Sequence, residues 1–135
     1  MYGFIEEIKE LLRFLFEEKN FKIMDKQGSY DESTGYAYVL MSNGVMDIRF
    51  IRDRGQKLWD IKSSQMKKNE WSSIGILRHI FLNDQLFRDF LNHPNARFIK
   101  DHYADIEGFF GSTNLLEARK AIKQAKSKRS KFLFG

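Results

Sequence analysis

Two dipeptides, Asn43-Gly44 and Arg54-Gly55, each interrupt a run of β-forming residues, and together they constrain the fold more than any other feature. Asn-Gly is the strongest short signal for a β-hairpin, because both residues of a tight two-residue turn must accept a positive φ. Arg is less usual than Asn or Gly at the first turn position, so a longer loop over 53–56 stays open as an alternative. The pattern predicts an antiparallel meander.

The two turns predict one register with an apolar face and an ionic face. A slip of one residue would move the apolar row to the wrong face, so such a register is well specified. The expected pairs are Met41 with Met46, Val39 with Ile48, Ala37 with Phe50, Phe50 with Trp59 and Ile48 with Ile61 on the apolar face, and Arg49 with Asp60 and Asp47 with Lys62 on the other.

Helices are expected before and after the meander in the sequence, from the spacing of apolar residues. The first runs from about Gly3 to Glu18, and it is followed by a short strand over 21–24 and a loop over 27–35. Four more are predicted over 71–82, over 84–91, from Pro94 to about Phe109, and from a cap at Asn114 onward. The expected core residues are Phe50, Trp59, Ile48, Ile61, Val39, Leu11, Ile8, Leu77 and Phe87.

These elements predict an α+β fold: an N-terminal helix, an antiparallel meander of three to four strands, and a C-terminal helical half packed on the sheet. A length of 135 residues suits a single domain over 1–135. The chain contains no Cys, and no segment approaches the roughly 20 apolar residues of a membrane span. Because the N-terminus also lacks the pattern of an export signal, we expect a cytoplasmic protein with no membrane partner.

Basic residues are concentrated in the C-terminal helix end and tail, over 119–135. This segment carries seven basic residues and no acidic one, whereas the whole chain has a net charge of +5. Such a row can neutralise the phosphates of a nucleic acid, although cations near a helix C-terminus also complement the helix dipole. The binding candidates in this segment are Arg119, Lys120, Lys123 and Lys126. The apolar tail over 132–134 could dock on the domain or on a partner, or stay frayed.

A second set of binding candidates lies on the meander. In the predicted register Tyr36, Tyr38, Arg49 and Ile51 share the face opposite the apolar row. Aromatic side chains beside an Arg on a sheet are typical of single-strand binding platforms. More often such a face is half covered by a helix or by a second subunit, and we favour this interpretation; a homo-oligomer is therefore possible.

Motifs for catalysis or metal binding are missing. The sequence contains no Gly-rich phosphate loop, nucleophile elbow or HExxH helix. The three histidines, His79, His93 and His102, are not spaced as metal ligands. Because His79 lies within an apolar helix, we expect a partly buried ring with one hydrogen bond. We therefore expect no catalytic residue, no cofactor and no metal site.

The segments "IRFIRDRGQKLWDIKSS", "WSSIGILRHIF" and "LLEARKAIKQAKSKRSKFLFG" together resemble small uncharacterised bacterial proteins, some of which are grouped with the immunity proteins of toxin systems. The resemblance implies a non-catalytic protein that binds and blocks a cognate toxin through surface complementarity. Because this chain is basic, the toxin or its docking face would be acidic or mixed. A nucleic-acid-binding protein that uses the basic C-terminal helix is the alternative.

Overall fold

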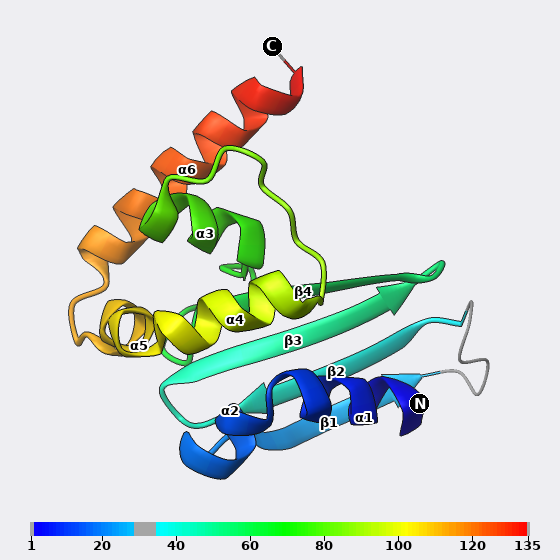
Figure 1. The fold of residues 1–135 in the computed structure, drawn as a ribbon. Helices are drawn as coiled ribbons and strands as arrows, with labels where there is room; N and C mark the ends of the chain where they lie inside the picture. The colour runs from blue at the N-terminus through cyan, green and yellow to red at the C-terminus, as the bar shows by residue number, and fades with distance from the viewer. Residues whose placement is uncertain (1, 29–34, 135) are drawn as a thin grey trace.

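The computed structural model describes residues 2–28 and 35–134 (Figure 1). It has the predicted α+β fold, with N-terminal helices, an antiparallel meander in the order β1-β2-β3-β4-β5, and C-terminal helices packed on it. Most of the predicted loop over 27–35 lies outside the described residues. The elements are α1 Tyr2–Leu11, α2 Arg13–Glu18, β1 Lys22–Gly28, β2 Ala37–Ser42, β3 Met46–Asp53, β4 Gln56–Ser63, β5 Ser72–Ser73, α3 Ile74–Leu82, α4 His93–Asp101, α5 Tyr103–Gly111 and α6 Leu116–Phe134.

The second hairpin has the predicted register. Phe50 pairs with Trp59 and Arg49 with Asp60 across β3 and β4. Arg54 adopts a φ of 53° and the following glycine a φ of 80°, so both turn residues have the positive φ that a two-residue turn requires. The alternative of a longer loop over 53–56 is therefore excluded.

The first hairpin differs from the prediction by two residues. Val39 pairs with Phe50, and Ser42 with Asp47 closes the ladder, so the loop is longer than Asn43-Gly44. Asn43 is not among the residues with positive φ; instead its side-chain oxygen accepts the N–H groups of residues 45 and 46, each at 3.0 Å. Because the shift is an even number, the apolar residues still share one face.

The inner face of the sheet packs against helices α1, α4 and α5, which lie in front of it in Figure 1. Phe50 and Trp59 are fully buried there and stack with their ring centroids 5.5 Å apart. Arg52, which the sequence analysis did not place in the core, is also buried on this face and donates to the carbonyl oxygen of Gly35. Of the other predicted core residues, Leu11 is only partly buried, and Phe87 belongs to a small second cluster under α6.

Two predicted helices are each broken once. The helix expected over 3–18 divides at Leu12, where φ is −123°, and α2 then turns to bury Phe14 and Leu15. The helix expected from Pro94 divides at His102 in the same way, with a φ of −115°. No proline or glycine stands at either break, so the local sequence carried no signal for it.

The helix predicted over 84–91 is wrong. Asn83 ends α3 in the left-handed conformation, and Phe87 has a φ of 53°, which a helix cannot accommodate. The segment instead runs along β4, where the N–H of Leu91 donates to the carbonyl oxygen of Lys57. The helix expected from Trp71 begins only at Ile74, because the two preceding serines form β5.

Gly75, in the first turn of α3, permits the close approach of this segment. A Cβ atom there would lie 2.5 Å from Asp89 Oδ1 and 2.6 Å from the carbonyl carbon of Phe87. Asp89 Oδ1 accepts the N–H of Gly75, and its other oxygen accepts from Arg129 of α6. The start of α3, the segment over 87–91 and the end of α6 are therefore held together at one point.

Candidate binding surface

The outer face of the sheet carries part of the predicted candidate set. Tyr38 pairs with Ile51, and Leu40 with Arg49, so these side chains share the face opposite Phe50. All four are half-buried, whereas the residues of the inner face are almost completely buried. Tyr36 precedes β2 and is 51% exposed. The helices labelled in Figure 1 do not cross the outer face, but the segment between β4 and β5 contacts it through Ser64 and Trp71.

The charges on this face are paired as the register predicted. Arg49 Nε lies 2.7 Å from Asp60 Oδ2, and Lys62 Nζ lies 3.0 Å from Asp47 Oδ2. Burial alone would raise the pKa of the Asp47 carboxyl, but hydrogen bonds from two serine hydroxyls and from Lys62 outweigh it and hold the pKa below its usual value. Burial raises the pKa of Tyr38, although the charge of Arg49 opposes this.

Trp71 joins the sheet candidates to the candidates on α6. The guanidinium of Arg49 lies 4.6 Å from the centre of the Trp71 ring, and Lys62 Nζ lies 5.5 Å from it. On the other side, Lys126 Nζ donates to the carbonyl oxygen of Trp71 at 3.0 Å. The structure thus links Arg49 of one candidate set to Lys126 of the other through Trp71. We call the surface around this link the Trp71 surface, and it consists of Tyr36, Tyr38, Arg49, Trp71 and Lys126.

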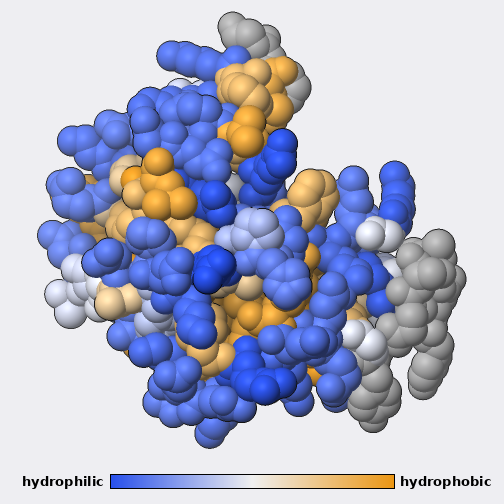
Figure 2. All heavy atoms as spheres, viewed as in Figure 1, coloured by the Kyte–Doolittle hydropathy of each residue, from blue (hydrophilic) through white to orange (hydrophobic). Residues whose placement is uncertain are grey.

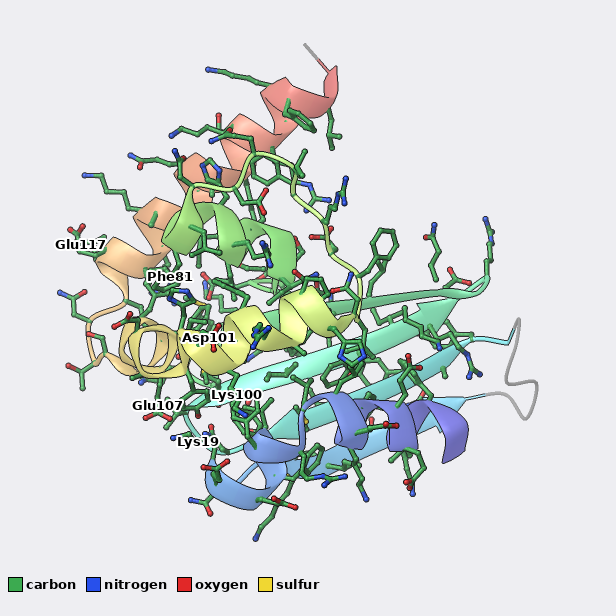
Figure 3. All side chains as sticks on the ribbon, viewed as in Figure 1. Lys19, Phe81, Lys100, Asp101, Glu107 and Glu117 are labelled. Carbon is green, nitrogen blue, oxygen red and sulfur yellow. The ribbon has the colours of Figure 1, made fainter. Side chains whose placement is uncertain are left out.

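Helix α6 uses some of its cations to dock on the domain. Arg119 donates from Nε and Nη2 to the carboxylate of Glu70, at 2.9 and 3.2 Å, and this bond holds the pKa of Glu70 below its usual value. Arg129 donates to Asp89 at 2.6 Å. In the described part of the chain, four lysines of this helix have no hydrogen-bond or ion-pair partner: Lys120, Lys123, Lys128 and Lys131. Its one acid, Glu117, projects away from the body in the first turn (Figure 3).

A groove lies between α6 and the segment that precedes β5. Met66 and Ile122 line it, each less than a tenth exposed. Its polar lining includes Glu70, Arg119, Lys123 and Lys126. The volume of the groove is about 250 Å³. The groove therefore combines an apolar floor with a rim that contains three cations and one carboxylate.

Apolar side chains are also exposed elsewhere. Figure 2 shows them around the C-terminal end of α6 and in the middle of the viewed face. Phe132 is 56% exposed, yet its ring lies 5.9 Å from that of Phe87, so this part of the predicted tail contacts the domain. Leu133 is 53% exposed.

Between α1 and the start of α4, Leu11 and Leu91 line a second groove of about 380 Å³.

The side chains of His79 and Tyr103 contact other parts of the fold. His79 is buried, stacks on Phe87 at 4.9 Å, and has Nδ1 3.0 Å from the carbonyl oxygen of Asp84, as expected for a partly buried ring with one hydrogen bond. Tyr103 donates to Glu107 and receives a bond from Asn43, where α2 and α5 meet near the labelled Lys19 and Glu107 of Figure 3. Within residues 2–28 and 35–134, no cluster of three His, Asp or Glu side chains could hold a metal ion.

Two residues that join α6 to the rest of the domain, Glu70 and Trp71, were not among the candidates predicted from the sequence. Trp71 was expected only as the first residue of the helix over 71–82, and Glu70 lay outside the predicted elements. The local sequence around them, Lys67-Lys68-Asn69-Glu70-Trp71, carries no pattern that singles them out. The contacts that give them significance join residues 49 positions apart for Glu70 and 55 for Trp71.

Comparison of the chain with known protein families, with curated proteins and with solved structures finds no match in any of the three. None of the helices in the described part of the chain is long and apolar enough to cross a membrane.

Proposed function

We propose that this chain is a non-catalytic protein-binding module that recognises its partner through the Trp71 surface. The observation that carries the proposal is Arg49, which is held by Asp60 and stacked on Trp71 on a sheet face that no labelled helix covers. Trp, Tyr and Arg are the residues that most often dominate the energy of protein interfaces. A fixed guanidinium also loses less conformational entropy on binding than a mobile one.

The charge balance of this surface favours a protein over a nucleic acid as the partner. Of the two cations of this surface, Arg49 is paired with a carboxylate, and Lys126 donates to the backbone carbonyl oxygen of Trp71. The neighbouring Lys62 and Arg119 are also paired with carboxylates. A surface that neutralises phosphates needs cations whose charge is not already compensated. A surface of paired charges and aromatic rings instead fits a protein face of mixed charge. The sequence resemblance would make that partner a bacterial toxin, with this chain as its inhibitor.

Binding to the purified product of the adjacent gene tests this proposal. We expect a stable complex in isothermal titration calorimetry, and we expect Trp71→Ala or Arg49→Ala to weaken it by about 2 kcal/mol. Arg97→Ala is the matched control, because Arg97 is an exposed arginine on α4, on the other side of the sheet. No binding of adjacent gene products, or equal effects of Arg49→Ala and Arg97→Ala, would overturn the proposal.

Nucleic-acid binding is the second candidate, because the five lysines of α6 have no carboxylate partner within residues 2–28 and 35–134. If these lysines bind a nucleic acid, its affinity must fall steeply with salt. A gel-shift titration with single-stranded RNA at two salt concentrations tests this. Binding that is absent or independent of salt excludes it.

A further inference from the structure

The groove between α6 and the segment before β5 suits one kind of ligand. We propose that it receives an apolar side chain flanked by a carboxylate, from an acidic segment of a protein partner. This inference rests on the proposed function, and it names the part of the partner that enters the groove.

The lining of the groove determines this chemistry. Met66 and Ile122 form an apolar floor, which an apolar group can contact and a free phosphate cannot. Around it stand Arg119, Lys123 and Lys126, against the single carboxylate of Glu70. The groove is therefore positively charged, and it complements an anionic ligand that also brings an apolar group.

The rim already holds one carboxylate in the manner we propose for the partner. Arg119 binds both oxygens of Glu70 through Nε and Nη2, in the two-point geometry that guanidinium groups form with carboxylates. Lys123 stands exposed at the same rim without an internal ion-pair partner in the described part of the chain. A ligand carboxylate would meet Lys123 directly, and it would compete with Glu70 for Arg119.

The groove also adjoins the Trp71 surface. Lys126 lines the groove and donates to the carbonyl oxygen of Trp71, whose ring contacts Arg49. A partner that covers the ring of Trp71 can therefore extend an adjacent acidic segment into the groove without a change in the fold.

A short peptide with one Phe between Asp and Glu residues is the probe. We expect amide chemical-shift changes in the ¹H–¹⁵N spectrum of the full chain to centre on residues 66–70 and 119–126. Lys123→Glu should weaken binding about tenfold, because it reverses a charge beside the ligand carboxylate. Lys120→Glu is the matched control, since it makes the same charge change on the same helix outside the groove, and it should change affinity less than twofold.

Glu70→Gln provides a test in the opposite direction. The substitution removes the competing carboxylate but leaves an oxygen that can accept the N–H of Lys67. We expect the peptide to bind about threefold more tightly to this variant. Unchanged or weaker binding would overturn the role of Glu70 as an internal competitor.

The outcomes separate this inference from the proposed function. If the peptide fails to bind while the adjacent gene product still requires Arg49 and Trp71, the groove inference is wrong and the proposed function stands. If the peptide binds in the groove but no adjacent gene product binds, the groove inference stands and the proposed function falls. Equal losses in Lys120→Glu and Lys123→Glu, or equal binding of a peptide with Ser in place of Phe, would indicate general attraction of polyanions and overturn the groove inference.

Discussion

Alternate residues of β3 meet opposite environments on the two faces of the sheet. Ile48 and Phe50 have no exposed surface, whereas the side chain of Arg49 between them is 30% exposed. The inner face is stabilised by burial of apolar area, and the outer face by ion pairs and contacts with Trp71. One set of strands thus carries the hydrophobic core on one face and the proposed recognition surface on the other, because neighbouring side chains of a strand point to opposite faces.

The outer face is also ordered without a helix to cover it. Arg49 on β3 and Lys62 on β4 are each held by a carboxylate on the neighbouring strand. Such pairs contribute little to the free energy of unfolding when they are partly exposed, but they fix the positions of long side chains. The four predictions that follow test this division between the faces.

Loss of Trp59 should have the largest effect. Trp59→Ala removes a fully buried ring and its hydrogen bond to the carbonyl oxygen of Phe90, and we expect the free energy of unfolding to fall by about 3–5 kcal/mol. Chemical denaturation followed by circular dichroism measures this. Trp71→Ala removes the same side chain from the outer face and should cost about 1 kcal/mol or less. Similar losses in the two variants would contradict the division between the faces.

Asp47→Asn should have an intermediate effect. The Lys62 side chain is only 8% exposed, so removal of its carboxylate partner leaves a nearly buried charge. We expect a loss of about 2 kcal/mol in urea denaturation. Asp60→Asn, at the more exposed pair with Arg49, should cost less than about 1 kcal/mol. Equal losses in the free energy of unfolding would mean that burial does not determine how much each ion pair contributes to stability.

Acid should weaken the fold partly through Asp47. Its pKa in the folded chain is below its usual value, so its contribution to stability is complete above the usual carboxyl pKa of about 4 and is lost as the pH falls through the lower folded pKa. The free energy of unfolding should therefore decrease below about pH 4. In Asp47→Asn the decrease should be less steep, and an identical pH dependence in both proteins would refute this assignment.

Arg49→Ala should have the smallest effect on stability. Its ion pair is partly exposed, and we expect a change of less than about 1 kcal/mol in the free energy of unfolding. The same variant should still lose affinity for the partner. A large loss of stability would show that the outer face supports the fold, and the separation between the faces would fail.

The two hairpins explain how far the sequence could predict the sheet. Arg54-Gly55, the less usual turn, forms the predicted two-residue turn, with both residues at positive φ and Asp53 paired with Gln56. Asn43-Gly44 does not, because the Asn43 amide donates to the carbonyl oxygen of Lys19 and to the hydroxyl of Tyr103. These partners are 24 and 60 residues away, so no local pattern could reveal them. The face of each strand residue was predictable because alternation survives an even shift.

The helical half was less predictable for the same physical reason. Leu86, Phe87, Phe90 and Leu91 have helical spacing, but the left-handed Asn83 and the backbone bonds to β4 prevent a helix. In the binding surface, the prediction correctly placed Tyr38 and Arg49 on one face. It did not foresee that α6 would meet that face at Trp71, because the contact depends on the packing of elements distant in sequence.

The glycine at position 75 has a consequence for the free edge of β4. Because no side chain separates α3 from Asp89, the chain over 89–91 lies along β4, continues where β5 stops, and supplies backbone partners to Lys57 and Trp59. An uncovered strand edge is a template on which a second polypeptide can add. A larger residue at position 75 would therefore displace the chain over 89–91 and leave this edge of β4 open to pairing with a second polypeptide.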